Sequence, residues 1–209
     1  MNATATATVP ATFEELKQLK CAALPFDNAD NPHGFSFSGV RRPTSNIVAH
    51  MPFLEFMASQ CGHVTEFGVR DGFSTCALLS GCRGKLVTYD IQRYPVVDVL
   101  EQLELPCAWE FHERSTVDDS LVIEPTDLLF VDTMHTYDQA IRELALHAGK
   151  ARRYIVFHDT YTFGRRGNVK GSEGLMIAIN EFAEANPDWR IAYHVNFNHG
   201  LTMLARAGA

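Results

Sequence analysis

The stretch TEFGVRDGFST, residues 65–75, joins an apolar segment to one of helical character through two glycines. It contains one carboxylate, two glycines and two hydroxyl side chains: Glu66, Gly68, Gly72, Ser74 and Thr75. Glycine permits a tight turn and also lets a backbone approach a ligand closely. The stretch is therefore either a plain turn from strand to helix or a binding loop, and the rest of the chain must decide between them.

Outward from this stretch, short segments rich in Val, Ile, Tyr and Phe alternate with segments of helical period. The predicted strands are HVTEFG (63–68), KLVTYD (85–90), CAWEFH (107–112), DLLFVD (127–132) and RYIVFHD (153–159). The helices predicted between them are FSTCALLSG (73–81), PVVDVLEQLEL (95–105), TVDDSLVI (116–123) and TYDQAIRELALHAGKA (136–151). Such alternation predicts a doubly wound α/β fold, in which helices cover both faces of a mostly parallel sheet.

The end of the chain departs from this rhythm. A helix predicted over 171–187 is followed by two strand-like segments, 189–196 and 200–206, with only FNHG between them. A parallel crossover needs a dozen or more residues, so these strands should form an antiparallel hairpin. The predicted sheet therefore has seven strands.

Three regions are expected along the chain: a disordered tail at 1–11, helices and a loop covering the site at 12–60, and the catalytic α/β domain at 61–209. Helical spacing predicts helices at 12–24 and 45–60, the second capped by Ser45. The segment 25–45 between them is rich in turn-forming residues. In a homo-oligomer, the helix at 12–24 and this loop are candidate subunit contacts.

Composition excludes several classes of protein. A net charge of −7 argues against a nucleic-acid-binding protein, because such proteins neutralise many phosphates. Five cysteines without a C-x-x-C pair indicate neither a disulfide framework nor a thiolate zinc site, and a cytoplasmic protein is expected. The sequence shows neither a secretory signal nor an apolar run long enough to cross a membrane.

Polar side chains end the predicted strands. Ligands of open α/β sheets bind outside the carboxyl ends of the strands, near the point where the strand order reverses. The residues at this rim are Glu66, Gly68, Asp90, His112, Asp132, His158 and Asp159. A helix cap or a solvated side chain would explain any one of them, but sheet packing alone does not explain the set.

The first turn lacks the middle glycine of G-x-G-x-x-G, which lets a backbone approach a pyrophosphate. Asp90 ends the second strand, where a carboxylate can accept hydrogen bonds from both ribose hydroxyls of a nucleoside. Together these two features predict an adenosine-like ligand without phosphates.

With the terminal hairpin, Glu-x-Gly-x-x-x-Gly and Asp90 make residues 45–206 resemble the class I S-adenosylmethionine (SAM) dependent methyltransferases. The resemblance implies that Glu66, Gly68 and Gly72 line the pocket for the methionine end of SAM. It implies that Ser74 and Thr75 reach the SAM carboxylate and that Asp90 holds the ribose. It also places His112 to Ser115 beside the adenine, although HERS differs from the acidic pair that is commoner there.

The motifs FVDTMHTYD and YIVFHDT resemble a narrower branch, the metal-dependent O-methyltransferases of sugars and natural products and the cephalosporin-hydroxylase-like proteins. The resemblance implies that Asp132 and Asp159 bind Mg²⁺ and that His135 is the catalytic base. His158 departs from this pattern, because it stands where an oxygen ligand is expected. An imidazole ligand weakens a Mg²⁺ site and favours Mn²⁺, Fe²⁺ or Zn²⁺.

Two interpretations of this cluster stay open. In the first, a divalent ion is bound by Asp132, His158 and Asp159, and His135 takes a proton from the acceptor hydroxyl. In the second, no metal is bound, His158 hydrogen-bonds within the rim, Asp159 caps the next loop, and either histidine is the base.

The segment 160–174, TYTFGRRGNVKGSEG, is either a solvated loop or a lid over the substrate. As a lid, its cations Arg165, Arg166 and Lys170 would suit an anionic small-molecule substrate, such as a phosphorylated or nucleotide-linked sugar. Sequence alone does not fix the acceptor.

Three rival functions remain. A nicotinamide-dependent oxidoreductase shares the topology, but the missing glycine and the terminal hairpin count against it. A non-haem iron oxygenase could use two histidines and a carboxylate, yet the adjacent His158 and Asp159 would have to splay apart. A SAM-fold subunit without chemistry is the third, and failure to bind SAM would favour it.

Overall fold

The computed structural model describes residues 10–22, 24–25 and 44–209. Most of the predicted tail and of the 25–45 loop lies outside the described residues. No described helix has the length and apolar character needed to cross a membrane.

A seven-stranded sheet forms the centre of the described chain, in the order β5-β4-β3-β6-β7-β9-β8. Its strands are β3 (His63–Phe67), β4 (Lys85–Asp90), β5 (Ala108–Glu113), β6 (Thr126–Val131), β7 (Ala151–His158), β8 (Trp189–Val195) and β9 (Leu201–Arg206). All neighbouring strands are parallel except at β9, which runs antiparallel to both β7 and β8. The predicted doubly wound sheet and its terminal hairpin are therefore confirmed.

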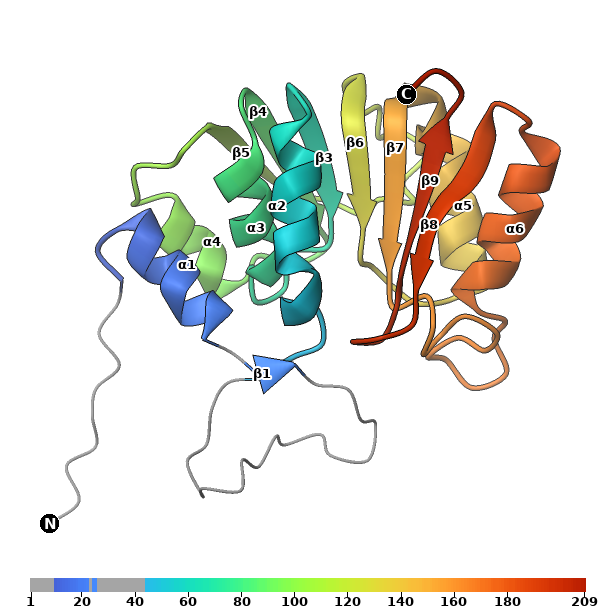
Figure 1. Cartoon of the computed structure of the whole chain (residues 1–209), viewed down its shortest axis with the longest axis horizontal. Coiled ribbons are helices and arrows are strands. Elements are labelled where there is room, and N and C mark those ends of the chain that lie inside the picture. The colour runs from blue at the N-terminus through green and yellow to red at the C-terminus, as the bar shows by residue number, and fades with distance from the viewer. Residues whose placement is uncertain (1–9, 23, 26–43) are drawn as a thin grey trace, which may run out of the picture.

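Helices cover both faces of this sheet (Figure 1). They are α1 (Phe13–Cys21), α2 (Met51–Ser59), α3 (Phe73–Gly81), α4 (Pro95–Leu100), α5 (Tyr137–His147) and α6 (Leu175–Ala185), with 3-10 turns η1 (Val48–His50) and η2 (Ala148–Lys150). A two-residue pair, β1 (Leu24–Pro25) and β2 (Thr44–Ser45), stands apart from the sheet.

The alternation of side chains along the strands builds two cores. Leu128 of β6 packs with the α1–α4 side, whereas the next residue, Leu129, packs with α5 and α6. Successive residues of a strand point to opposite faces, which is why one continuous apolar segment serves both layers. Because α1 and α2 share a core with the sheet, the predicted boundary at residue 60 divides a packed unit and stays a prediction.

Two helix predictions are wrong. Residues 116–123 form turns and irregular backbone instead of a helix, because the Asp118 carboxylate accepts hydrogen bonds from the backbone N–H (2.8 Å) and hydroxyl (2.8 Å) of Ser120. Ser45 is not a helix cap, since it belongs to β2 and its hydroxyl accepts from the Ile47 N–H at 3.2 Å. The helix begins later, at Met51, with Pro52 in its first turn.

The strand order reverses between the neighbouring strands β3 and β6. The chain adds β4 and β5 on one side of this point and β7 on the other. In Figure 1 the carboxyl ends of β3, β6 and β7 point to the lower edge of the view, where the loop after β7 also lies. This is the edge at which an open α/β sheet binds its ligand.

Candidate functional site

The glycines of the turn after β3 are required by the protein's own packing. Gly68 has φ +93°, and a Cβ there would lie 2.1 Å from the backbone oxygen of Asp132. Gly72 has φ +73°, and a Cβ there would lie 2.7 Å from a methyl group of Val96. Replacing Gly68 by Val would therefore disturb the join between β3 and β6 before it affected any ligand.

Glu66 is completely buried at the end of β3. Its carboxylate accepts hydrogen bonds from the Ser74 hydroxyl at 2.6 Å and the Thr75 hydroxyl at 2.8 Å. Burial raises the pKa of Glu66 to about 8, although these two hydrogen bonds act in the opposite direction. Thr75 is itself fully buried, so its hydroxyl serves Glu66, whereas Ser74 also lines the site cavity.

Asp90 ties the end of β4 to the glycine turn. One carboxylate oxygen accepts from the N–H groups of Val69 (2.8 Å) and Arg70 (3.3 Å), and the other accepts from the Gln92 N–H at 3.1 Å. Arg70 has φ +45°, a strained backbone conformation for a residue with a side chain. The structure thus gives Asp90 a role in shaping the turn, and its ribose contact stays a prediction.

The predicted adenine-side residues lie apart from the site cavity. His112 stacks on Tyr89, with ring centroids 5.0 Å apart and planes at 19°. The Ser115 hydroxyl accepts from the Val117 N–H at 3.4 Å. Neither residue lines the cavity described next.

A cavity of about 570 Å³ opens at the switch point of the sheet. One wall comes from the turn after β3, including Gly68, Arg70 and Ser74, and another from residues after β6 and β7. The residues of this second wall are Asp132, Thr133, His135, Asp159, Phe163 and Asn168. The cavity therefore connects the predicted cofactor turn with the predicted metal and base residues.

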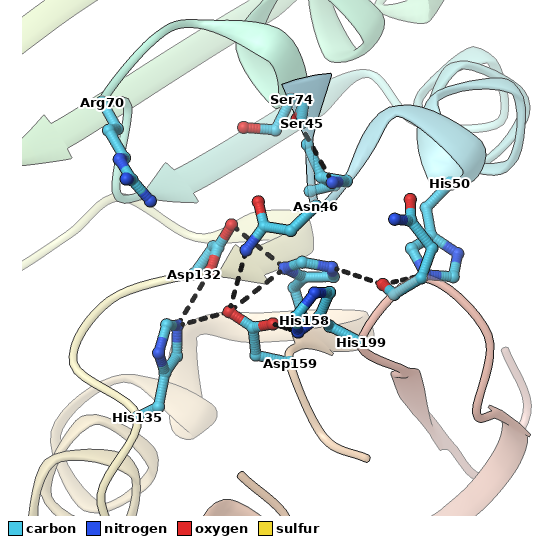
Figure 2. A network of polar contacts seen from close by, with 12 residues as sticks. Ser45, Asn46, His50, Arg70, Ser74, Asp132, His135, His158, Asp159 and His199 are labelled. Carbon is cyan, nitrogen blue, oxygen red and sulfur yellow. Dashed lines mark hydrogen bonds and ion pairs between the residues drawn. The ribbon is translucent and has the colours of Figure 1, made fainter. Parts of the chain in front are cut away.

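Two carboxylates and two imidazoles converge on this cavity (Figure 2). The His158 Nδ1 atom lies 3.3 Å from Asp132 Oδ2 and 3.6 Å from Asp159 Oδ2. The His135 Nε2 atom lies 3.2 Å from Asp132 Oδ1 and 2.9 Å from Asp159 Oδ2. The structure thus brings together the four residues of the predicted metal and base site.

A backbone carbonyl on the side away from the two carboxylates fixes the orientation of His158. Its Nε2 atom lies 3.2 Å from the Asn198 carbonyl oxygen, which can only accept, so Nε2 carries a proton. Its Nδ1 atom is buried without a hydrogen bond and faces the two carboxylates. Burial lowers the pKa of His158, but the charge of Asp132 and then that of Asp159 raise it above its ordinary value.

Asp159 is buried and backbone-strained. Its side chain is completely inaccessible, its φ is +60°, and its Oδ1 atom makes no hydrogen bond, although His199 Nδ1 lies 3.6 Å away. Strain of this kind is characteristic of functional sites. A buried carboxylate with an unsatisfied oxygen is costly unless a positive charge compensates it.

A divalent cation fits these residues. One ligand atom from each of Asp132, His158 and Asp159 lies within 4.8 Å of the others. Two carboxylate oxygens and a neutral imidazole nitrogen are a donor set for Mn²⁺, Fe²⁺ or Zn²⁺ more than for Mg²⁺. The buried Nδ1 and Oδ1 atoms without hydrogen bonds are what such an ion would satisfy.

His135 stands beside this cluster at the cavity wall. Its ring stacks on Phe163, with centroids 4.9 Å apart and planes at 4°. Burial lowers the pKa of His135, but hydrogen bonds to Asp132 and Asp159 outweigh it and raise the pKa to about 10. Asp132 is affected in the opposite sense: burial raises its pKa, yet His158 and His135 hold it well below its usual range.

Sequence reasoning missed three residues that support the cluster: His50, Asn198 and His199. The His50 Nε2 atom lies 3.1 Å from the same Asn198 carbonyl that His158 contacts, and Asn198 Oδ1 accepts from the Ala49 N–H at 2.9 Å. Burial, and next the neighbouring His158, lower the pKa of His50 to about 4. The sequence feature that could have indicated two of them is the short FNHG link. In the structure its Asn198, His199 and Gly200 all have positive φ.

Asn46 also reaches the cluster, from the segment just before η1. Its side-chain nitrogen donates to Asp159 Oδ2 at 3.4 Å. Figure 2 shows it approaching from the side opposite to His135 and His199.

A second buried carboxylate lies behind the first. Glu143 of α5 accepts from the hydroxyls of Thr116 (2.5 Å) and Thr133 (2.9 Å) and from the Gln139 side-chain nitrogen (2.8 Å). Burial raises the pKa of Glu143 to about 7. Because Thr133 follows Asp132, this network holds the backbone beside the cluster.

Comparisons with known proteins agree with this geometry. A family described as "Methyltransferase domain" matches residues 65–160. No curated protein is similar enough in sequence to count as a relative.

Solved structures share the fold at low sequence identity. An S-adenosylhomocysteine (SAH)-bound methyltransferase from Podospora anserina is 16% identical, with 95% of this chain and 88% of that chain covered and a TM-score of 0.55. An O-methyltransferase from Bacillus cereus, in complex with SAH, is 16% identical over 97% and 93% of the chains, with a TM-score of 0.55.

MycE of the mycinamycin biosynthetic pathway was solved with Mg, SAH and mycinamycin VI. It is 16% identical, covers 77% of this chain and 49% of that chain, and has a TM-score of 0.55. The order of the strands, the turn after β3 and the family match thus agree with the resemblance found in the sequence. Residues 65–160 match the methyltransferase-domain family, and the described chain has the fold of these solved methyltransferases.

Proposed function

We propose that the protein transfers the methyl group of SAM to a hydroxyl group of a small molecule, such as a sugar or another natural product. The observation that carries this proposal is that Asp132, His135 and Asp159 line the same cavity as the turn after β3, with His158 buried against the two carboxylates. That cavity brings a nucleophile-activating cluster to a turn of the kind that holds SAM.

On the cofactor side, Gly68 and Gly72 shape the turn and Ser74 lines the cavity. Glu66 would receive the amino group of the methionine end, with Thr75 holding Glu66 in place. Asp90 would hold the ribose, and Ser115 would lie towards the adenine. Each of these assignments rests on position in the fold together with the contacts described above.

On the acceptor side, Asp132, His158 and Asp159 would hold a divalent metal, Mg²⁺ or Mn²⁺, with the imidazole favouring Mn²⁺. Such an ion supplies Lewis acidity, which lowers the pKa of a bound hydroxyl. His135 would take the hydroxyl proton once an ion bound to Asp132 and Asp159 draws on the two carboxylates that hold its Nε2 atom and raise its pKa to about 10. The Phe163 ring stacks on its imidazole. General base catalysis contributes typically about 10² to 10⁴ in rate.

Alignment of the acceptor is the other task of the site. The sulfonium methyl of SAM is already activated, so the protein must hold the acceptor oxygen in line with the methyl and the sulfur. Positioning of this kind can supply roughly 7 to 11 kcal/mol of the barrier.

The setting of the protein is part of the proposal. All five cysteines are free, which suits a reducing cytoplasm. The acidic net charge suits a small-molecule substrate better than nucleic acid or a membrane surface. Residues 12–60 would cover the site and take part in contacts between subunits if copies of the chain assemble.

The test is a comparison of SAM binding and turnover in His135→Ala. SAM affinity, measured by calorimetry, should stay within about twofold of the wild type. Turnover of an acceptor found by screening sugars and phenols should fall by about 10² or more. Unchanged turnover would refute the role of His135. Absence of SAM binding in the wild type would favour a subunit without chemistry.

A further inference from the structure

The loop between β7 and α6 forms a second cavity next to the first. This cavity, of about 610 Å³, is lined entirely by residues 165–173. Asn168 lines both cavities, so the second opens directly beside the site.

The loop is fixed to the catalytic cluster. The Asn168 N–H donates to the His135 backbone oxygen at 3.0 Å, and the Phe163 ring stacks on the His135 imidazole. The Tyr137 N–H donates to the Glu173 backbone oxygen at 2.9 Å, which ties the far end of the loop to the start of α5. A group bound by this loop would therefore have a set position relative to the base.

The loop also has internal order. The Gly167 N–H donates to the Ser172 carbonyl at 3.0 Å, and the Ser172 N–H and hydroxyl both donate to the Val169 carbonyl, at 3.0 and 2.7 Å. Gly171 has φ +87°, which closes the turn. These contacts present the loop side chains on a defined frame.

The charge of this cavity is opposite to that of the whole chain. Arg165, Arg166 and Lys170 line it, and none of them forms an ion pair with any carboxylate of the described chain. The one carboxylate of the lining is Glu173, while the chain as a whole carries −7. Within the described part of the chain, the backbone N–H groups of Val169, Lys170 and Gly171 donate no hydrogen bond. Unpaired cations and free N–H groups together are what an anion requires.

We infer that residues 165–173 bind an anionic group, a phosphate or a carboxylate, carried by the methyl acceptor. Asn168 of this loop bonds to the His135 backbone, and no residue of the turn after β3 lines the second cavity, so that cavity serves the acceptor and not the cofactor. This inference rests on the proposed function, which it deepens by giving the acceptor a charged group at a set distance from its reacting hydroxyl.

The test uses the metal-free full chain and inorganic phosphate, titrated at low ionic strength and followed by calorimetry or NMR. The loop variant carries Arg165→Gln, Arg166→Gln and Lys170→Gln. A control variant removes three cations at the opposite edge of the sheet: Arg83→Gln, Lys150→Gln and Arg190→Gln. Both variants change the net charge equally, so a difference between them reports the loop and not the overall field.

Wild type and control should bind phosphate alike, and the loop variant should lose about tenfold or more in affinity. The inference is overturned if the wild type binds no phosphate, if the loop variant binds it as the wild type does, or if the control loses as much. SAM affinity is measured in the same three proteins and should be equal. Absence of SAM binding would refute the proposed function and leave the phosphate comparison intact.

Discussion

In the proposed metal site, His158 is the side chain that would set the preference for one ion over another. A carboxylate in its place would give three oxygen donors, which suit Mg²⁺, whereas imidazole favours transition metals. Its Nδ1 atom faces Asp132 and Asp159, so its identity acts directly on any ion between them.

We expect His158→Asp to shift the preference from Mn²⁺ towards Mg²⁺. The wild type should bind Mn²⁺ about tenfold or more tightly than Mg²⁺, and the variant should narrow or invert this ratio. Calorimetric titration of both metals checks it, with circular dichroism to verify that the variant is folded. Equal ratios in the two folded proteins would mean that His158 is no ligand.

Glu66 should make stability depend on pH. Its pKa in the folded protein, about 8, lies above its ordinary value of 4.5, so folding favours the protonated form. Its contribution is fully present below about pH 4.5 and is lost as the pH rises towards about 8. As the pH rises from about 4.5 to about 8, the free energy of unfolding of the wild type should therefore fall. That of Glu66→Gln should not fall for this reason, because glutamine cannot ionise.

The measurement is chemical denaturation of both proteins across that pH range, without cofactor. Glu184→Gln, which changes an exposed carboxylate on α6, is the matched control and should follow the wild type. A stability profile of Glu66→Gln parallel to that of the wild type would contradict the raised pKa.

At the scale of elements, the turn between β8 and β9 supports the cluster from outside the parallel sheet. The Asn198 carbonyl oxygen in this turn accepts hydrogen bonds from the Nε2 atoms of both His50 and His158. Residues that orient a metal ligand typically change metal affinity by about 10- to 100-fold when they are lost. His50→Phe keeps the ring contact with Phe197 but removes the donor to Asn198.

We therefore expect His50→Phe to weaken Mn²⁺ binding by about tenfold while SAM affinity stays unchanged. Phe56→Ala, an exposed change on the neighbouring helix α2, is the control for a general loss of packing. Mn²⁺ affinity equal to that of the wild type would show that the His50 contact does not orient His158.

Thr136 caps α5 directly after His135. Its hydroxyl accepts from the Gln139 N–H at 3.3 Å. Thr136→Ala should lower the free energy of unfolding by about 1 kcal/mol, and Thr136→Ser, which keeps the acceptor, should lose much less. Denaturant unfolding of the two variants compares them, and equal losses would mean that packing of the methyl group, and not the cap, is responsible.

The sequence predicted each strand of the main sheet to within two residues at either end, because buried runs such as that of β6 carry their own signal. The helix expected at 116–123 does not form, because the Asp118 carboxylate makes local hydrogen bonds to Ser120 instead. Asp132, His158 and Asp159 could be placed together because strand ends share one edge, and the family resemblance added His135. His50 and Asn198 could not, because their contact joins segments 148 residues apart and depends on tertiary packing.

At the scale of the whole molecule, the site joins two halves of the sheet. The predicted cofactor residues lie between β3 and the end of β4, with Ser115 after β5, and the predicted metal residues stand at the ends of β6 and β7. The halves meet where Gly68 packs against the Asp132 backbone oxygen. A ligand bound across this join is linked to unfolding of the whole sheet, since any molecule that binds only the folded state stabilises it.

SAH should therefore raise the midpoint of thermal unfolding, by the equivalent of about 2.7 kcal/mol at 100 times its dissociation constant. NAD at the same concentration should have no effect, because the turn after β3 lacks the glycine that admits a pyrophosphate. Mn²⁺ should add to the SAH shift in the wild type but not in Asp159→Asn, which weakens the metal set and leaves the cofactor turn unchanged. A shift with NAD and none with SAH would instead identify a nicotinamide-dependent oxidoreductase.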